Sequence, residues 1–157
     1  MRSKSLFILI LALLAGAAFP AQAGPVAETL AGSWACMAKE LGSDLAMTIT
    51  YRRSDDFLVG EIKEDDGAAL LDVWLSDGQA DLVLRRIISP DSVIEMTVAE
   101  EAPASMKLEG EMRLNFGGAA KVREAFQFAG NEEFHAVWEA DNGGGWQIIL
   151  DRTCKRV

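Results

Sequence analysis

Histidine, cysteine and tyrosine are scarce in this sequence, which has one histidine, two cysteines and one tyrosine among 157 residues. A Ser-His-Asp triad, or a histidine ligand to haem or to a metal, would have to use His135. His135 alternates with Phe134 and Ala136, which indicates that it faces outward from a strand. An H-E-x-x-H motif, a Walker loop and a glycine-rich dinucleotide turn are also missing. We therefore expect a protein that is not an enzyme and that uses no metal or cofactor.

The longest apolar run lies near the N-terminus and is short for a membrane span, which needs about 20 residues. It covers Leu6 to Phe19, follows Arg2 and Lys4, and precedes an Ala21-Gln22-Ala23 cleavage pattern. This arrangement is typical of a secretory signal peptide over residues 1–23. We expect residues 24–157 to form one exported domain, periplasmic or secreted, with no membrane span after cleavage.

Basic residues are in the minority once the signal is removed. Without Arg2 and Lys4, 13 basic residues face 24 acidic ones, a net charge of −11. Such a surface repels nucleic acid and anionic lipid. The acidic stretches Asp55-Asp56 and Glu64-Asp65-Asp66 lack the regular spacing of a calcium loop, so we interpret them as turn residues.

Only one disulfide is possible, because Cys36 and Cys154 are the two cysteines. In an oxidising compartment such a pair usually forms a bond, which here would join the two ends of the chain. Two free, buried thiols are the alternative.

Apolar and polar residues alternate through most of the chain after Gly42, which indicates strands with one buried face. Ser105 to Phe116 is the clearest example, and about ten such segments can be recognised. Short turn signals such as Asp66-Gly67 separate them, and no gap has room for a crossover helix. A bond between Cys36 and Cys154 would place the first and last strands side by side. We therefore predict an all-β fold, an antiparallel up-and-down β-barrel of about ten strands.

The alternation also predicts which side chains point inward. Leu71, Val73 and Leu75 share one face of their strand, and the wider inward set is Trp34, Leu84, Met96, Met112, Leu114, Phe126, Phe128, Trp138 and Ile148.

Three charged residues, Arg86, Glu124 and Arg152, fall on positions of apolar parity. A buried charge needs a partner. One interpretation is an Arg86–Glu124 pair, or strand ends near the mouth of the barrel. The other is a guanidinium at Arg86 that receives a ligand carboxylate.

The early Gly32-Ser33-Trp34 and the closing Trp146…Arg152-Thr153-Cys154-Lys155-Arg156 resemble the lipocalin-like, or calycin, barrels. Small exported bacterial proteins with Gly-x-Trp-x-Cys near the start and Cys-x-Arg near the end are the most similar. The resemblance implies a barrel with an internal cavity for a small apolar ligand, and no catalytic residues. Nitrobindins have a second glycine where Cys36 stands and a histidine near the C-terminus, which this sequence lacks.

From these observations we expect a monomeric, non-enzymatic binding protein with an internal cavity for a small hydrophobic or amphipathic ligand. The expected ligand-binding residues are Arg86, Met112, Glu124, Phe126 and Phe128. The alternative is a surface-acting interaction protein, such as a periplasmic protease inhibitor, with Gly24 to Ala31 as the segment that enters the protease.

Overall fold

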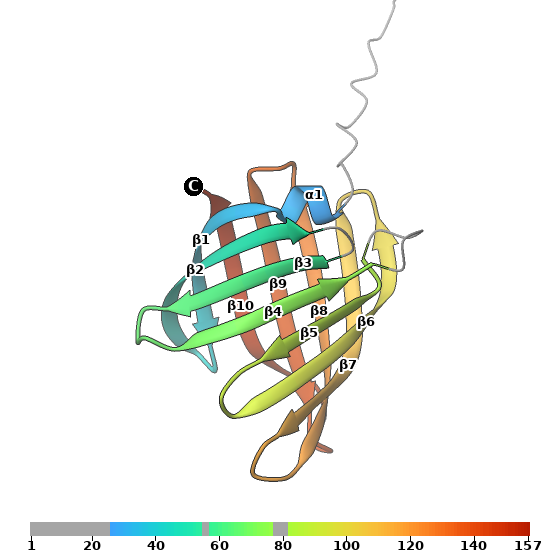
Figure 1. The fold of residues 1–157 in the computed structure, drawn as a ribbon. Coiled ribbons are helices and arrows are strands. Elements are labelled where there is room, and N and C mark those ends of the chain that lie inside the picture. Colours follow the sequence, from blue (N-terminus) through green and yellow to red (C-terminus); the bar gives the residue numbers. More distant parts are fainter. Residues whose placement is uncertain (1–25, 55–56, 77–81) are drawn as a thin grey trace, which may run out of the picture.

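Ten antiparallel strands close into a barrel in which each strand pairs with its neighbours in the chain and β1 pairs with β10 (Figure 1). The structure, a computed structural model, describes residues 26–54, 57–76 and 82–157. The elements are α1 (Val26–Leu30), β1 (Gly32–Glu40), β2 (Ser43–Ser54), β3 (Phe57–Glu64), β4 (Ala69–Leu75), β5 (Leu84–Ile88), β6 (Ser92–Ala102), β7 (Ser105–Leu114), β8 (Ala119–Ala129), β9 (Glu133–Asp141) and β10 (Gln147–Arg156). The all-β, up-and-down barrel is therefore confirmed, whereas the signal peptide lies outside the described residues.

The disulfide is located at the closure of the barrel. Cys36 on β1 is directly opposite Cys154 on β10, and the two are bonded, with their Cα atoms 4.0 Å apart. The predicted pairing is confirmed.

The short helix α1 covers the end of the barrel at which β1 begins (Figure 1). Val26, Ala27 and Leu30 are buried, and the backbone carbonyl oxygen of Leu30 accepts a hydrogen bond of 2.8 Å from Nε1 of Trp34. The described part of the segment expected to enter a protease is thus packed against the barrel. Within the described residues, no helix is long and apolar enough to cross a membrane.

Gly32 permits a close contact that holds this end together. A Cβ on Gly32 would lie 2.4 Å from Nη1 of Arg156. The Arg156 guanidinium stacks 4.3 Å from the Trp34 ring and donates hydrogen bonds to the carbonyl oxygens of Thr29 and Ala31. A side chain at position 32 would displace the end of this arginine, and the backbone at Gly32 has a positive φ of 124°, which other residues rarely adopt. Both features explain the glycine of the Gly-x-Trp motif.

Most of the predicted inward residues do point inward. Trp34, Met96, Phe126 and Phe128 are buried, and Leu114 is half-buried; Met112 and Trp138 are half-buried and pack against the core. The prediction for Ile148 is wrong, because its side chain is 57% exposed. A register shift between Ile148 and Leu150 turns this residue to the outer wall.

On β4 and β5 the predicted inward face is the outer one. Asp72 and Trp74 are fully buried inside the barrel, whereas Leu71 is 43% exposed on the outside. On β5, Arg85 is buried and Ile88 is exposed, with Leu84 half-buried on the outer side. Both faces of these strands carry apolar residues, so alternation of hydrophobicity could not show which face is inside.

Candidate functional site

The barrel interior contains five linked polar side chains, here called the ion cluster: Tyr51, Asp72, Arg85, Glu124 and Arg152. Arg85 donates two hydrogen bonds to Asp72, of 2.9 Å from Nε and 2.8 Å from Nη2, and a third to Glu124. Arg152 donates to the other oxygen of Glu124 at 2.9 Å, and the Tyr51 hydroxyl donates to Asp72 at 2.6 Å. Two cations and two anions therefore balance within the cluster.

The ion cluster is shielded from solvent, since all four charged members are at most 2% exposed. Burial and the neighbouring Asp72 raise the pKa of Tyr51 far above its usual value, so this phenol remains a donor. Burial lowers the pKa of Arg85, but Asp72 and Glu124 outweigh it and the net shift is upward. Burial also raises the pKa of Glu124, although Arg85 and Arg152 oppose this shift. Because its guanidinium groups and carboxyl groups pair with one another, the cluster needs no external counter-ion.

Aromatic rings surround these charges. The Arg85 guanidinium lies 4.5 Å from the centre of the Trp74 ring and 5.4 Å from that of Trp138. Phe126 stacks on Phe128 at 5.8 Å and contacts Phe134 at 5.7 Å. Two buried N–H groups in this region, Nε1 of Trp74 and Nε of Arg152, have no hydrogen-bond partner among the described residues. The Trp138 indole N–H lies beside the Glu124 carboxyl group and interacts with it.

The structure separates the residues that the sequence proposed as one ligand site. Arg86 points to the outer wall, where it pairs with Glu95 and its side chain is 48% exposed, so the prediction of an inward Arg86 is wrong. Glu124 is buried as expected, but its partners are Arg85 and Arg152. Phe126 and Phe128 belong to the aromatic core, and Met112 is half-buried against it. The ligand-binding role of these residues stays a prediction.

Sequence reasoning missed Tyr51, Asp72 and Arg85 as members of the ion cluster. Asp72 offered one signal, because it is the one charged residue in the apolar run from Leu70 to Leu75. Its position predicts a buried cation as its partner. Arg85 and Arg86 are adjacent in the sequence, and only the register of β5 against β4 decides which of the two points inward.

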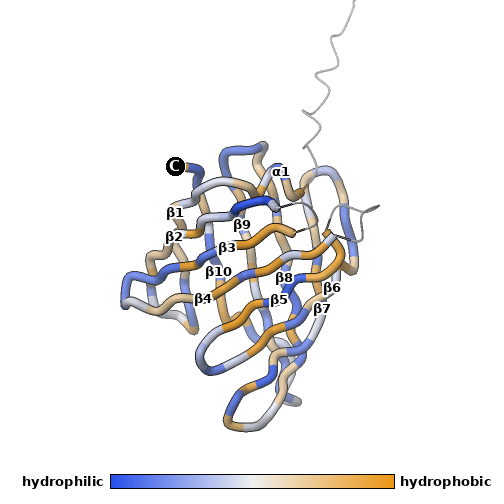
Figure 2. The backbone as a smooth tube through the Cα atoms, viewed as in Figure 1, coloured by the Kyte–Doolittle hydropathy of each residue, from blue (hydrophilic) through white to orange (hydrophobic). Residues whose placement is uncertain are grey.

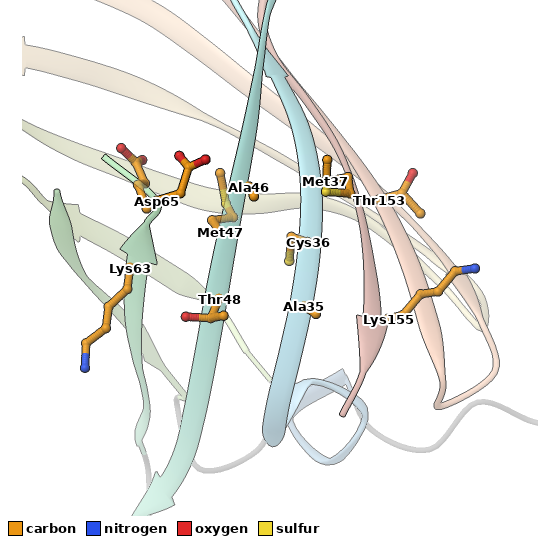
Figure 3. Close-up of a pocket in the computed structure, with 11 residues that line it drawn as sticks. Ala35, Cys36, Met37, Ala46, Met47, Thr48, Lys63, Asp65, Thr153 and Lys155 are labelled. Atoms are coloured by element: carbon orange, nitrogen blue, oxygen red, sulfur yellow. The ribbon is translucent and has the colours of Figure 1, made fainter. Parts of the chain in front are cut away.

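A hollow of about 570 Å³, here called the outer hollow, lies on the barrel wall over β10, β1, β2 and β3 (Figure 3). Two rows of outward side chains cross these strands: Lys63, Thr48, Ala35 and Lys155 in one, and Ala46, Met37 and Thr153 in the other. Ala35 and Thr48 give the first row small central side chains, whereas Met37, which is 64% exposed, occupies the centre of the second row. The full lining is Ala35, Cys36, Met37, Ala46, Met47, Thr48, Lys63, Glu64, Asp65, Thr153 and Lys155.

Charged groups border the outer hollow on several sides. Lys63 and Lys155 lie on opposite sides of it (Figure 3), and both side chains are well exposed. Each forms a surface ion pair, Lys63 with Glu61 at 3.2 Å and Lys155 with Glu133 at 3.6 Å. Glu64 and Asp65 line one end. Partial burial, followed by the nearby carboxylates of Glu40, Asp66 and Asp65, raises the pKa of Glu64. The hollow thus combines an apolar floor with two cations and an acidic end.

His135 faces outward, as predicted, and its Nε2 lies 2.7 Å from Oδ1 of Asp151 on the neighbouring strand. Among the described residues, no three histidine, cysteine, aspartate or glutamate side chains lie close enough together to hold a metal ion.

No family model matches the chain, and no curated protein matches it in sequence. Among solved structures, the chain is similar to Rv2717c from M. tuberculosis, with a TM-score of 0.62, 13% sequence identity and coverage of 86% of this chain and 99% of that one. It is also similar to EF1p2_mFAP2b bound to DFHBI, with a TM-score of 0.43, 14% identity and coverage of 85% and 98%. The likeness to Rv2717c establishes the barrel fold alone, and the lipocalin-like assignment stays a prediction.

Proposed function

We propose that this protein is an exported, non-enzymatic binding protein that holds a small amphipathic ligand in the outer hollow. The observation that carries the proposal is the hollow itself, with its volume of about 570 Å³, a floor that includes Ala35, Ala46 and Met37, and a lysine on either side. Small-molecule sites typically measure about 300–1,000 Å³ and combine apolar walls with a few polar groups. The floor would contact the apolar part of the ligand, and either Lys63 or Lys155 would attract its negative group. Their pairs with Glu61 and Glu133 are exposed and therefore weak, so a ligand anion can compete for the lysine.

The interior is poorly suited to the carboxylate ligand expected from the sequence. Asp72 and Glu124 already neutralise Arg85 and Arg152, so a further anion would leave one negative charge unbalanced in a buried site. The unpartnered N–H groups of Trp74 and Arg152 favour a second candidate site there. A neutral ligand with hydrogen-bond acceptors would suit these two donors.

Export is supported by two observations. The bonded Cys36–Cys154 pair suits an oxidising compartment. The first 23 residues have the order of charge, apolar run and cleavage pattern that signal peptides share. The absence of catalytic motifs from the sequence supports binding rather than catalysis.

A titration with dansyl-labelled undecanoic acid tests the outer hollow. We expect saturable binding to the wild type and at least about tenfold weaker binding to Lys63→Met/Lys155→Met, because one charge-assisted contact contributes about 1.5–3 kcal/mol. Ala35→Phe should weaken binding as well, since the ring would occupy the floor of the hollow. Both changes lie on the outer wall, so thermal unfolding should change little.

Lys107→Met is the matched control, because Lys107 is also an exposed lysine of the outer wall and pairs with Glu100 on β6. Its affinity should equal that of the wild type. Equal affinity in all variants would contradict the outer hollow. If Trp74→Phe weakened binding while the outer-wall variants did not, the ligand would occupy the interior instead. No saturable binding to the wild type would contradict both sites.

A further inference from the structure

Met37 differs from the other methionines of the described residues because its side chain is well exposed. It is 64% exposed on the outer wall, whereas Met47, Met96 and Met106 are at most 5% exposed and Met112 is half-buried. The hydrophobic stretches that lie side by side on β3, β4 and β5 (Figure 2) contain no methionine. Within the described part of the chain, a reagent in solution therefore reaches the thioether of Met37 before the others.

The register of the strands explains this exposure. Met37 on β1 is opposite Thr153 on β10 and Ala46 on β2. Both neighbours have shorter side chains than methionine, so the end of the Met37 side chain stands above them on the outer wall. Its sulfur atom is therefore open to attack from solution.

No cysteine thiol competes with Met37 for an oxidant. Cys36 and Cys154 are the two cysteines of the chain, and they are bonded to each other. Cysteine thiolates and methionine thioethers are the side-chain groups that peroxides oxidise most readily. With both thiols in a disulfide, Met37 is the most accessible oxidisable sulfur among the described residues.

Met37 also belongs to the site proposed above. It lines the outer hollow and, together with Thr153, a neighbouring hollow of about 310 Å³ over β10, β1 and β2. The two hollows therefore meet at Met37. Its unbranched thioether gives the floor a flexible apolar surface that can adapt to an apolar ligand.

We propose that Met37 is an oxidation site, and that its conversion to methionine sulfoxide weakens ligand binding in the outer hollow. The second part of the proposal rests on the proposed function. The oxidant is a peroxide, which transfers one oxygen atom to the sulfur of Met37. The sulfur gains an S=O bond and is oxidised by two electrons, while the O–O bond of the peroxide breaks and the second oxygen leaves as water or an alcohol.

The sulfoxide suits the floor of the hollow poorly. Oxidation converts a flexible apolar side chain into a polar one. An apolar ligand group placed on it would remove water from the new oxygen, which costs free energy. Ala35 and Ala46 cannot be oxidised, so Met37 is the part of the floor whose polarity can change. Because Met37 points away from the core, the barrel itself should remain intact.

Peptide mapping by mass spectrometry after brief treatment with hydrogen peroxide tests the oxidation site. We expect Met37 to be oxidised at least about tenfold faster than Met47, Met96 or Met106, with Met112 between them, because the rate follows exposure. The same treatment in concentrated urea should remove the difference, since every methionine is then exposed. Equal rates at Met37 and at the buried methionines of the folded protein would overturn the assignment.

Titration with dansyl-labelled undecanoic acid tests the effect on binding. The oxidised wild type should bind at least about fivefold more weakly than the untreated protein. Met37→Leu is the matched variant, because leucine is apolar but cannot be oxidised, so peroxide should leave its affinity at the value measured before treatment. Met112→Leu lacks the next most exposed methionine and should still lose affinity on oxidation. Thermal melts should show that every oxidised sample remains folded.

Methionine sulfoxide reductases A and B should restore binding to the oxidised wild type, with the intact mass showing that the disulfide remains. Unchanged affinity after complete oxidation of Met37 would overturn the effect on binding, and so would an equal loss in Met37→Leu. If the untreated wild type did not bind the probe, the proposed function would fail and the effect on binding with it. The peptide map would then still decide whether Met37 is the oxidation site.

Discussion

Arg85 and Arg86 are adjacent in the sequence, yet the barrel gives them opposite environments. Arg85 is fully buried between Asp72 and Glu124. Arg86 lies on the outside and pairs with Glu95, and the side chains of Arg86 and Glu95 are each about half exposed. Removing one partner from a buried ion pair leaves an uncompensated charge, whereas a surface pair contributes little.

Substitution of each arginine by methionine should therefore give very different results. Arg85→Met leaves Asp72 and Glu124 short of a partner inside the barrel, and we expect it to lower the free energy of unfolding by about 3–5 kcal/mol. Arg86→Met should change it by less than about 1 kcal/mol. Urea denaturation of the two variants measures the difference. Equal losses would contradict the register of β5.

Glu64 carries a carboxyl group whose ionisation opposes folding. Its pKa is raised in the folded protein, first by burial and then by Glu40, Asp66 and Asp65, so the folded state binds the proton more tightly than the unfolded state. The stability that the folded protein gains by binding this proton is complete below the pKa of Glu64 in the unfolded chain, about 4.3. It is lost as the pH rises through the higher pKa of the folded protein. At neutral pH the ionised group therefore destabilises the barrel.

Glu64→Gln should accordingly stabilise the protein at pH 7 by up to about 1 kcal/mol, and this gain should vanish near pH 4. Urea denaturation at both pH values measures the change in the free energy of unfolding that the substitution causes. Glu132→Gln, at an exposed position between β8 and β9, controls for the general effect of removing one negative charge. A gain from Glu64→Gln that persisted at pH 4 would rule out this explanation.

At the level of the strands, the sequence predicted some elements well and others with the wrong face. In β7, Met106 and Leu108 are buried and alternate with exposed Lys107 and Glu109, so the pattern of hydrophobicity identified both the strand and its orientation. In β4, Leu71 and Val73 are as apolar as the side chains inside. Hydrophobicity alone could not show that Asp72 occupies the interior.

Strand pairing explains why the ion cluster and the outer hollow could not be predicted. The cluster joins residues from β2, β4, β5, β8 and β10, and its distances depend on the register of strands that are far apart in the sequence. The outer hollow exists because the small Ala35 and Thr48 lie opposite each other on β1 and β2, with Lys155 beside Ala35 and Lys63 beside Thr48. Neither Ala35 nor Thr48 is unusual within its own strand, so the sequence carried no local signal.

For the molecule as a whole, two features close the barrel: the pairing of β1 with β10 and the disulfide between them. The chain forms β1 at one end and β10 at the other, and these pair without interruption from Trp34 opposite Arg156 to Glu40 opposite Leu150. The disulfide lies within this same pairing and links residues 118 positions apart. The hydrogen bonds between β1 and β10 stabilise the folded state. The disulfide adds stability mainly by lowering the conformational entropy of the unfolded chain.

Cys36→Ala/Cys154→Ala should therefore keep the barrel but lower its stability. In the chain-entropy model a loop of this length contributes about 4–5 kcal/mol, so we expect the urea midpoint to fall steeply while the far-ultraviolet circular dichroism in water stays unchanged. Addition of a reductant should destabilise the wild type by a similar amount and leave the double variant unaffected, which separates loss of the bond from packing changes at the two sites. Loss of strand signal in water would show that β1 and β10 cannot close the barrel without the covalent link. An unchanged midpoint would show instead that the unfolded chain is already restricted by other means.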